Sequence, residues 1–514
     1  MITAQQLLPK LPTGIAGFEQ ITNGGLPENR STLISGTAGS GKTVFALQFL
    51  VSGVSDFGEN GVFVTFEETP DDLMRNVVSF GWDLQAMVRD HKIAVVDATP
   101  EPGEVTIEAG AYDLSALLAR IENAIRQVGA KRVILDAVGA LFPQFTDANV
   151  VRRELHRIHA GLRMLGVTTL ITMERTGEEA GIGRFGVEEF VADNVILLRN
   201  RIDQEKRRRT IEILKFRGST HQKGEYPFTI DAEDGVMIIP LSAIELKQRS
   251  SQIRVSSGVR ELDTMCGGGM YRDSIILTSG ATGTGKTLMV TQYIKAAIEA
   301  GERAILFGAE ESREQLTRNA ASWGVDFEKA ERDGLLKIIC RYPEIMGLED
   351  HLLHLKRDIK TFEPKRVAVD SMSAFERVST PKSFREFVIG LTSFIKQQEI
   401  TGLFTNTTSM LMGGETITET HISTITDTII LLRYVELHGE MRRGLTVLKM
   451  RGTWHEKDIR EYVIDNQGMH IKEPFRGIHG ILSGTPVYSY AEERQRLGGM
   501  FGSHQDGGGR ASAG

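Results

Sequence analysis

The sequence repeats itself at a spacing of about 240 residues, and this duplication constrains the fold more than any other feature. Two glycine-rich loops form one pair of repeated motifs, GTAGSGKT from Gly36 and GATGTGKT from Gly280. The segments KRVILD and KRVAVD, which end at Asp136 and Asp370, form a second pair, and three further motif pairs occur in the same order. A period this long is typical of a duplicated domain rather than of a solenoid repeat.

Each copy alternates short apolar runs rich in β-branched residues with amphipathic stretches. Residues 133–135, 168–173 and 194–198 have the composition of buried parallel strands, whereas 115–128 and 384–397 have the apolar periodicity of helices. Strands that alternate with helices predict an α/β domain with a mostly parallel central sheet flanked by helices. We therefore expect two tandem α/β domains of the same architecture.

Composition sets the limits of these domains. The 514 residues are 41% apolar and 25% charged, as in globular proteins, so bulk disorder is excluded. The polar stretch 241–256 is expected to be a linker between an N-terminal domain, 1–240, and a C-terminal domain, 257–484. Residues 485–514 are rich in Gly, Gln, Arg and Ser, which cannot build a core, and they predict a flexible tail.

Charge and cysteine content limit the classes of partner and compartment. The formal net charge of −7 argues against constitutive binding to nucleic acid, although it leaves room for a local basic groove. Cys266 and Cys340 are too few for a disulfide framework and favour a reducing compartment. The sequence shows neither a signal peptide nor an apolar run of membrane-spanning length, so we expect a cytoplasmic protein without membrane contact.

Both glycine-rich loops fit the phosphate-binding pattern G-x-x-x-x-G-K-[ST] between a strand and a helix. Glycines let successive backbone N–H groups curl around phosphate oxygens, and the helix N-terminus adds a positive dipole. We expect Lys42 and Lys286 to reach the β- and γ-phosphates, and the hydroxyls of Thr43 and Thr287 to bind Mg²⁺. The residues predicted to cradle ATP are Gly36, Thr37, Ala38, Gly39, Ser40, Gly41, Lys42 and Thr43, with Gly280, Ala281, Thr282, Gly283, Thr284, Gly285, Lys286 and Thr287.

Carboxylates follow two predicted strands in each copy. Asp136 and Asp370 end apolar strands, where a side chain faces the ligand crevice of a parallel sheet. We predict that they hold Mg²⁺ or its water, with helix capping as the alternative. A glutamate pair ends another strand, and one member can face the nucleotide and accept a proton from an attacking water or hydroxyl; a solvated turn is the alternative. These glutamates are Glu67, Glu68, Glu310 and Glu311.

A basic pair recurs late in each copy, in the segments LKFRG and LKMRG. Strand alternation places both members of a pair on one face. They either protect an exposed sheet edge or, as arginine fingers do, reach the phosphates of a neighbouring subunit. The residues concerned are Lys215, Arg217, Lys449 and Arg451.

The two copies differ at a stretch that precedes this basic pair. With the offset that aligns Asp136 with Asp370, the adjacent hydroxyls of Ser423 and Thr424 align with Glu189 and Phe190. Phosphorylation is therefore open to the C-terminal copy alone, where it would add close to two negative charges. Polar filler in a β-rich run is the alternative interpretation. The same offset aligns two further pairs, Asp427 with Asp193 and Arg433 with Arg199.

The duplication, the loops, the glutamate pairs and the segment ITETHISTITDTIILLRY together resemble the KaiC family of circadian clock proteins, within the RecA-like ATPase superfamily. The resemblance covers about residues 8–485 and implies two tandem RecA-like P-loop domains, with ATP bound between the subunits of a homohexamer of two stacked rings. It implies slow ATP hydrolysis in the N-terminal ring. It also implies that the C-terminal ring phosphorylates and dephosphorylates itself at Ser423 and Thr424, with ADP formed in phosphorylation usable in the reverse reaction.

The same resemblance implies roles for single residues. Glu310 is expected to be the general base of the kinase and a ligand of Mg²⁺, with Glu67 or Glu68 as its counterpart for water. Thr418 is expected to shuttle phosphate, and Arg377 to lie at a subunit interface. Further contacts to ATP, from the same subunit or its neighbour, are expected from Ser79, Lys215, Phe216, Arg217, Thr220, His221, Trp323, Arg443, Lys449, Met450 and Arg451.

Departures from the family pattern bear on activity and partners. Ala137 stands where the family more often has serine, so the rate of hydrolysis in the first ring could differ. Glu419 stands where aspartate is usual, which is a mild change. The tail after about residue 480 is short and glycine-rich, which makes a KaiA-like activator doubtful, whereas a KaiB-like partner on the N-terminal ring is plausible.

Two other classes of protein stay open. A nucleic-acid motor or recombinase would line its pore with basic loops, and residues 199–209 (RNRIDQEKRRR) are the candidate. The same residues equally suit a solvated hairpin turn. A signalling scaffold would use its rings only to display partners.

Overall fold

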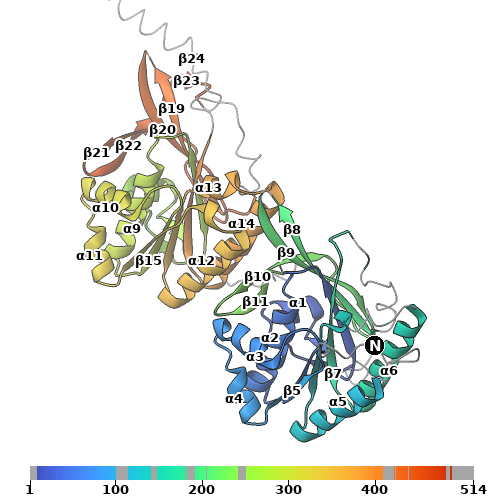
Figure 1. Cartoon of the computed structure of the whole chain (residues 1–514). Coiled ribbons are helices and arrows are strands. Elements are labelled where there is room, and N and C mark those ends of the chain that lie inside the picture. Colours follow the sequence, from blue (N-terminus) through green and yellow to red (C-terminus); the bar gives the residue numbers. More distant parts are fainter. Residues whose placement is uncertain are drawn as a thin grey trace, which may run out of the picture. The chain divides into compact units, whose positions relative to one another are not determined.

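The computed structural model describes residues 8–99, 114–140, 148–179, 181, 192–203, 205–240, 250–408, 422, 424–437, 439–481 and 487–488. The chain divides into two compact units, Met1–Glu245 and Leu246–Gly514, called below the N-terminal and the C-terminal unit. Among the described residues, each unit contains one nine-stranded sheet with helices on its faces (Figure 1). The predicted α/β fold class is confirmed.

The sheet of the N-terminal unit is mixed: six of its strands are parallel, and the three strands at one end are antiparallel. Its spatial order is β11 (Gly235–Ile238), β10 (Glu225–Asp231), β9 (Lys206–Phe216), β8 (Asn194–Asp203), β3 (Ser31–Gly36), β7 (Thr168–Glu174), β6 (Arg132–Asp136), β4 (Gly61–Thr65) and β5 (Ile93–Asp97). Strands β8, β3, β7, β6, β4 and β5 are parallel to one another, whereas β9, β10 and β11 are antiparallel to their neighbours. The helices are α1 (Phe18–Thr22), α2 (Lys42–Phe57), α3 (Pro70–Asn76), α4 (Leu84–Arg89), α5 (Leu114–Val128) and α6 (Ala148–Met164), and β1 (Lys10–Leu11) pairs with β2 (Leu26–Pro27).

The C-terminal unit has the same sheet topology. Its spatial order is β16 (Leu336–Cys340), β15 (Ala304–Gly308), β17 (Arg366–Asp370), β18 (Thr401–Thr407), β14 (Ile275–Gly280), β19 (Thr428–Leu437), β20 (Glu440–Met450), β21 (Arg460–Asp465) and β22 (Gly468–Pro474). The helices are α8 (Arg260–Met265), α9 (Lys286–Glu299), α10 (Arg313–Ser322), α11 (Phe327–Arg332), α12 (Leu348–Phe362), α13 (Met372–Arg377) and α14 (Pro381–Gln397). The predicted strands and helices of both copies lie inside β6, β7, β8, α5 and α14.

Parallel pairing positions the candidate sites. Strands β3 and β14 are buried along their whole length because neighbouring strands flank them and helices cover the sheet faces. The carboxyl ends of parallel strands meet at one edge of a sheet. Gly36, which ends β3, and Asp136, which ends β6, therefore lie on the same edge, as do Gly280 and Asp370 in the C-terminal unit.

The long hairpins have the same register in both units. Asn194 pairs with Phe216 in the β8–β9 hairpin, and the residues at the equivalent positions, Thr428 and Met450, pair in the β19–β20 hairpin. Each hairpin has a bulge at the equivalent point, after Val195 and after Ile429. The structure thus supports the sequence alignment that pairs Asp427 with Asp193.

An arginine is buried at the start of an inner strand in each unit. The Arg132 side chain has no exposed area and donates to Glu59 through Nε at 2.8 Å and through Nη2 at 2.7 Å. It also donates to the backbone carbonyls of Phe49 at 2.7 Å and Pro12 at 2.8 Å, and its guanidinium packs over the rings of Phe49 and Phe57. Arg366 repeats this arrangement with Glu302 and Tyr293. A buried charge requires such partners. The arginine therefore links its strand to the neighbouring segments of the core in each unit.

We expect Arg132→Met to lower the free energy of unfolding of the N-terminal unit by about 3–5 kcal/mol, because it leaves Glu59 and two carbonyls without their donor. The exposed neighbour Lys131 is the matched control, and Lys131→Ala should change stability by less than about 0.5 kcal/mol. Calorimetric unfolding of the full chain measures both variants. Equal stability of the two variants would show that the buried arginine contributes nothing.

The expected linker and tail are described only in part. Within the expected linker, Arg254–Val255 form β12, which pairs with β13 (Met270–Tyr271). Of the expected tail, residues 487–488 form β24, which pairs with β23 (Ile478–His479); the other residues of 485–514 lie outside the described part. No described helix has the length and apolarity needed to cross a membrane.

Candidate functional sites

Both phosphate loops adopt a conformation that depends on glycine. Gly39 and Gly41 have φ of 72° and 94°, and Gly283 and Gly285 have φ of 81° and 98°, a region that favours glycine. A Cβ added to Gly36 would lie 2.4 Å from Ser40 Oγ, so the loop has no room for a side chain there. Each loop leads from a central strand into a long helix, α2 or α9, as the motif requires.

The loop lysines fold back over their own loops. Lys42 Nζ donates to Thr37 O at 3.0 Å, and Lys286 Nζ donates to the carbonyls of Gly280 at 2.9 Å and Ala281 at 3.0 Å. Burial lowers the pKa of both lysines, and nearby carboxylates oppose this shift. A mostly buried cation whose bonds go to carbonyls suits an incoming phosphate, because an anion compensates its charge better than a carbonyl does.

The predicted Mg²⁺ ligands lie together in each unit. Thr43 Oγ1 donates to Asp136 at 3.0 Å, and Thr287 Oγ1 donates to Asp370 at 2.8 Å. Burial raises the pKa of both aspartates, the expected response of a carboxylate in a dry site. One carboxylate and one hydroxyl suit a cation that completes its shell with phosphate oxygens and water, as Mg²⁺ does.

A second hydroxyl on each aspartate is not apparent from the sequence. Thr172 on β7 and Thr405 on β18 donate to the remaining oxygen of Asp136 and Asp370, respectively. Both threonines lie on the strand next to the aspartate. Each aspartate is therefore held from two sides, which fixes its direction.

The glutamates are held in related ways. Asn319 Nδ2 donates to Glu311 at 3.0 Å, and Asn76 Nδ2 donates to Glu68 at 3.2 Å. The other member of each pair is the one whose charge acts on the loop lysine: Glu310 raises the pKa of Lys286, as Glu67 does that of Lys42. Glu67 and Glu310 are thus the members whose charge acts on the loop lysines, although in the C-terminal unit Glu311 lines the same pocket as Glu310.

The hydrogen bonding of Glu310 and Glu67 differs between the two units. Ser371 Oγ donates to Glu310 at 3.0 Å, and the Arg377 guanidinium pairs with the same carboxylate. Ala137 takes the place of Ser371 in the N-terminal unit, so Glu67 lacks that donor. Burial, followed by the carboxylate of Glu174, raises the pKa of Glu67. Glu174 ends β7 and was not predicted as a site residue; its counterpart in the sheet is Thr407.

In the C-terminal unit these groups share one pocket of about 380 Å³. Trp323, predicted to contact nucleotide, lines it together with both glutamates. Thr407, Asn319 and Ile464 also line it and were missed by sequence reasoning, because they come from segments without a motif. The predicted residues in the lining are Thr282, Gly283, Gly285, Lys286, Thr287, Glu310, Glu311, Trp323 and Asp370.

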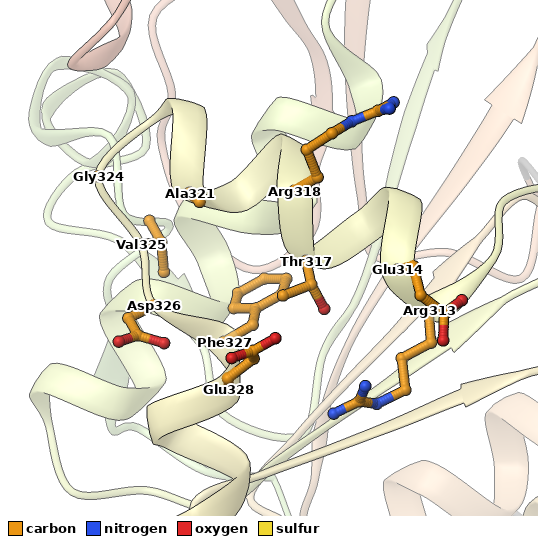
Figure 2. Close-up of a pocket in the computed structure, with 10 residues that line it drawn as sticks. All are labelled: Arg313, Glu314, Thr317, Arg318, Ala321, Gly324, Val325, Asp326, Phe327 and Glu328. Carbon is orange, nitrogen blue, oxygen red and sulfur yellow. The ribbon is translucent and has the colours of Figure 1, made fainter.

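A second hollow lies between α10 and α11 and has a volume of about 540 Å³. Figure 2 shows Asp326 on the connecting turn and Arg313 and Glu314 at the opposite end. A hollow of about 600 Å³ lies at the equivalent place between α3 and α4. Its lining includes Trp82 and Asp83, which align in the duplicated sequence with Val325 and Asp326. The hollow belongs to the duplicated fold, and no phosphate-loop residue lines it.

The other predicted ATP contacts are dispersed. Ser79 lies in a 3₁₀ turn (Val78–Phe80) and donates to Asn76 O at 3.3 Å. Phe216 and Met450 are buried in the cores, which leaves only their backbone for a ligand. Thr220 accepts from Asn23 Nδ2 at 3.2 Å. His221 packs edge-on against Phe216, and the Arg443 guanidinium lies 5.7 Å from the Tyr434 ring centroid.

The basic pair of the C-terminal unit holds the segment of the predicted phosphoacceptors. Lys449 Nζ donates to Thr426 O and Arg451 Nη2 donates to Thr424 O, both at 2.8 Å. Asp427 accepts from Ile275 N at 2.8 Å, which anchors the segment to β14. Thr424 itself is exposed. Five residues named in the sequence analysis lie outside the described part, namely Glu189, Phe190, Thr418, Glu419 and Ser423.

The same contact recurs in the N-terminal unit. Lys215 Nζ donates to Ala192 O at 2.7 Å, and Ala192 aligns with Thr426, which accepts from Lys449. Arg217, directly after β9, has its backbone N–H 3.2 Å from Asn194 Oδ1. The side chains of Lys215, Lys449 and Arg451 therefore hold the chain that enters the long hairpin of their own unit.

Apart from Gln204, which lies outside the described residues, the basic stretch 199–209 lies at the tip of the β8–β9 hairpin. Arg199 pairs with Glu212 at 2.6 Å, and Arg207 donates to Asn200 O at 3.1 Å. Arg209 Nε donates to Gly39 O at 3.3 Å, in the phosphate loop. Three of its cations are thus engaged within the unit.

Each unit thus carries a P-loop site at the carboxyl edge of its own sheet, and comparison with known proteins agrees with this duplication. The family described as "ATPase: KaiC" matches residues 11–243 and 255–475. This chain belongs to the KaiC family. Each unit is accordingly a nucleotide-binding, RecA-like ATPase domain.

Close relatives share nearly the full length of the chain. A KaiC relative from Synechocystis, "Circadian clock protein KaiC3", is 61% identical over 96% of this chain and 98% of its own. "Circadian clock oscillator protein KaiC" of Thermostichus vulcanus is 56% identical over 97% of this chain and 95% of its own. The KaiC of Parathermosynechococcus lividus is 58% identical over 95% and 90%, respectively. KaiC proteins thus align with both units and with their order.

Proposed function

We propose that this chain is a circadian clock ATPase whose N-terminal unit hydrolyses ATP slowly and whose C-terminal unit phosphorylates and dephosphorylates itself at Ser423 and Thr424. One observation carries the proposal. The acceptor segment is tied through Arg451 and Lys449 to a strand of the unit that carries the second phosphate loop. The N-terminal sequence offers Glu189 and Phe190 at the equivalent positions, and neither can accept phosphate.

The chemistry assigned to the C-terminal unit uses its own residues. Glu310, oriented by Ser371, accepts the proton of the acceptor hydroxyl. The hydroxyl oxygen then bonds to the γ-phosphorus while the bond from that phosphorus to the bridging oxygen breaks, which releases ADP. In the reverse reaction ADP takes the phosphoryl group back and Glu310 returns the proton.

Mg²⁺ is the metal that this donor set would hold, through Thr287 and Asp370 in one unit and Thr43 and Asp136 in the other. Glu310 is a further candidate ligand. When bound, the cation neutralises phosphate charge and aligns the β- and γ-oxygens.

In the N-terminal unit we assign Glu67 to a water molecule in place of the hydroxyl. Ala137 offers no hydroxyl to orient this glutamate, whereas Glu310 has Ser371. A base that is less firmly oriented gives slower proton transfer. This difference supports slow hydrolysis at the N-terminal site.

We also propose a homohexamer in which the basic pairs of one subunit approach the ATP of the next. Lys215, Arg217, Lys449 and Arg451 lie at the ends of long strands, where they could exchange backbone carbonyls for a neighbour's phosphates. A KaiB-like partner remains a proposal for the N-terminal ring, and a KaiA-like activator remains doubtful. Binding to nucleic acid is the less favoured function, because cations of the 199–209 hairpin are engaged internally and the net charge is −7.

Phosphosite mapping during incubation of the purified chain with Mg-ATP tests the proposal. We expect phosphate on Ser423 and Thr424 whose level changes over hours to a day, with none on Thr426, whose buried hydroxyl is the matched control. Strongly salt-dependent binding to DNA, without any phosphate at these positions, would instead favour a nucleic-acid motor.

A further inference from the structure

A carboxylate is attached to the phosphate loop of the N-terminal unit. Thr37 Oγ1 donates to Glu178 Oε1 at 2.6 Å, and the backbone N–H of Asn200 donates to the same oxygen at 3.1 Å. Thr37 is the second residue of the loop, Glu178 follows β7, and Asn200 lies on β8. One carboxylate oxygen thus joins three segments that are distant in the sequence.

Glu178 and Lys42, the expected partner of the phosphates, both contact the same loop residue, Thr37. Lys42 Nζ, expected to reach the β- and γ-phosphates, donates to the carbonyl oxygen of Thr37 at 3.0 Å. Thr37 therefore meets the ammonium group through its carbonyl and Glu178 through its hydroxyl. Two like charges in a partly dry site repel each other, so a γ-phosphate and the Glu178 carboxylate disfavour one another here.

The segment that carries Glu178 is held in place by its backbone. The buried Arg175 donates through Nη2 to Glu178 O at 2.9 Å and through Nε to Gly181 O at 3.1 Å. Asn200 Nδ2 donates to Gly39 O at 3.3 Å, which ties β8 to the loop as well. The carboxylate is thus presented to the loop by a built framework.

The contact is nevertheless easy to give up. Within the described part of the chain, Glu178 Oε2 is buried and has no hydrogen-bond partner. A buried, half-satisfied carboxylate carries a desolvation penalty that is relieved when the side chain turns towards water. Rotation of one side chain therefore opens the contact without moving the framework.

Three side chains of this arrangement, those of Thr37, Arg175 and Asn200, have no like counterpart among the described residues of the C-terminal unit. Ala281 stands at the position of Thr37, and Tyr434 at that of Asn200. Thr408 takes the place of Arg175, since the N–H of each donates to the glycine that ends the central strand. Leu411, which lies outside the described residues, stands three residues after Thr408, as Glu178 stands three residues after Arg175. The contact is a property of one nucleotide site.

We propose that Glu178 is a specificity-determining latch that disfavours the γ-phosphate at the N-terminal site. ATP displaces the carboxylate from Thr37, whereas ADP, which lacks the γ-phosphate, leaves it in place. The latch shifts the preference of this site from ATP towards ADP. This inference rests on nucleotide binding at the Lys42 loop, which is part of the proposed function.

Equilibrium binding of ADP and of a non-hydrolysable ATP analogue to the full chain tests the latch, with Lys286→Ala silencing the other loop. Glu178→Gln keeps an acceptor for Thr37 but removes the charge, so we expect about tenfold tighter binding of the ATP analogue and unchanged binding of ADP. Thr37→Ala, which introduces the alanine found in the C-terminal loop, should also tighten binding of the ATP analogue. The double variant should gain little more than either single one, because both remove one contact.

Glu179→Gln is the matched control. Its side chain is 89% exposed and lies 3.4 Å from Arg201, so the substitution removes a neighbouring charge that does not contact the loop. It should leave both affinities within about twofold. An unchanged affinity ratio in Glu178→Gln, or equal weakening of both nucleotides, would overturn the latch. Failure of the Lys286→Ala parent to bind either nucleotide would overturn the N-terminal nucleotide site itself.

Discussion

Lys286→Ala should abolish self-phosphorylation of Ser423 and Thr424, by at least about 100-fold, and leave most ATP hydrolysis intact. Lys286 is the loop lysine expected to reach the β- and γ-phosphates of the C-terminal site, and its removal takes away that compensating charge. The N-terminal unit has its own lysine, Lys42, and its own Thr43–Asp136 pair, so its hydrolysis continues. Phosphosite mapping and phosphate release, measured on the same sample, report the two activities separately.

Two variants delimit this result. Lys295→Ala removes a half-exposed lysine from the same helix, α9, where it faces Glu299 at 3.9 Å, and it should change neither activity. Lys42→Ala should show the reverse pattern, with most hydrolysis lost. The proposed division of labour fails if Lys286→Ala removes all hydrolysis while Lys42→Ala removes none.

Mixed hexamers should show that phosphate is transferred between subunits. Lys449 and Arg451 lie within hydrogen-bond distance of the acceptor segment, so a neighbour's ATP that met these two cations would also lie close to Thr424. In-line transfer requires the acceptor oxygen to approach the phosphorus to roughly 3–3.5 Å. A subunit with Lys286→Ala and intact hydroxyls should therefore become labelled when mixed with a subunit that has a working loop and the substitutions Ser423→Ala and Thr424→Ala.

Neither variant should be labelled alone, which gives at least about a tenfold contrast with the mixture. Subunit exchange is checked independently with copies of two sizes. If exchange occurs and the mixed hexamers carry no phosphate on the intact hydroxyls, transfer within one subunit is the correct description. The assignment of Lys449 and Arg451 to the interface would then lose its main support.

Features that depend on local motifs can be predicted from this sequence. Gly36–Thr43 and Asp136 are recognisable because a loop between strand and helix, and a carboxylate at a strand end, are short patterns with a fixed place in a parallel sheet. The duplication strengthens each of them, since a chance match would not recur at the same offset. The strand and helix order follows from the same periodicities.

Features that depend on the register of distant strands could not be predicted in this way. Thr172 meets Asp136 through the pairing of β6 and β7, although the two residues lie in different motifs of the sequence. Arg132 and Lys131 are adjacent basic residues in the sequence, yet Arg132 is fully buried and Lys131 is exposed, because Glu59 and two carbonyls lie on only one side. Glu178 belongs to no motif. The difference between Thr37 and Ala281 was the one available signal, and its meaning depends on what the threonine contacts.

The bulges in the two long hairpins determine which face of the sheet each following residue occupies. In each bulge a leucine is left over between paired residues, Leu214 in β9 and Leu448 in β20, and these side chains are 41% and 48% exposed. A strand presents alternate residues to opposite faces, so one extra residue exchanges the faces of everything beyond it. Lys215 and Lys449 come directly after these leucines. Both copies have the inserted residue. Because of it, Lys215 and Lys449 lie on the sheet face that the adjacent residue would occupy in a strand without a bulge.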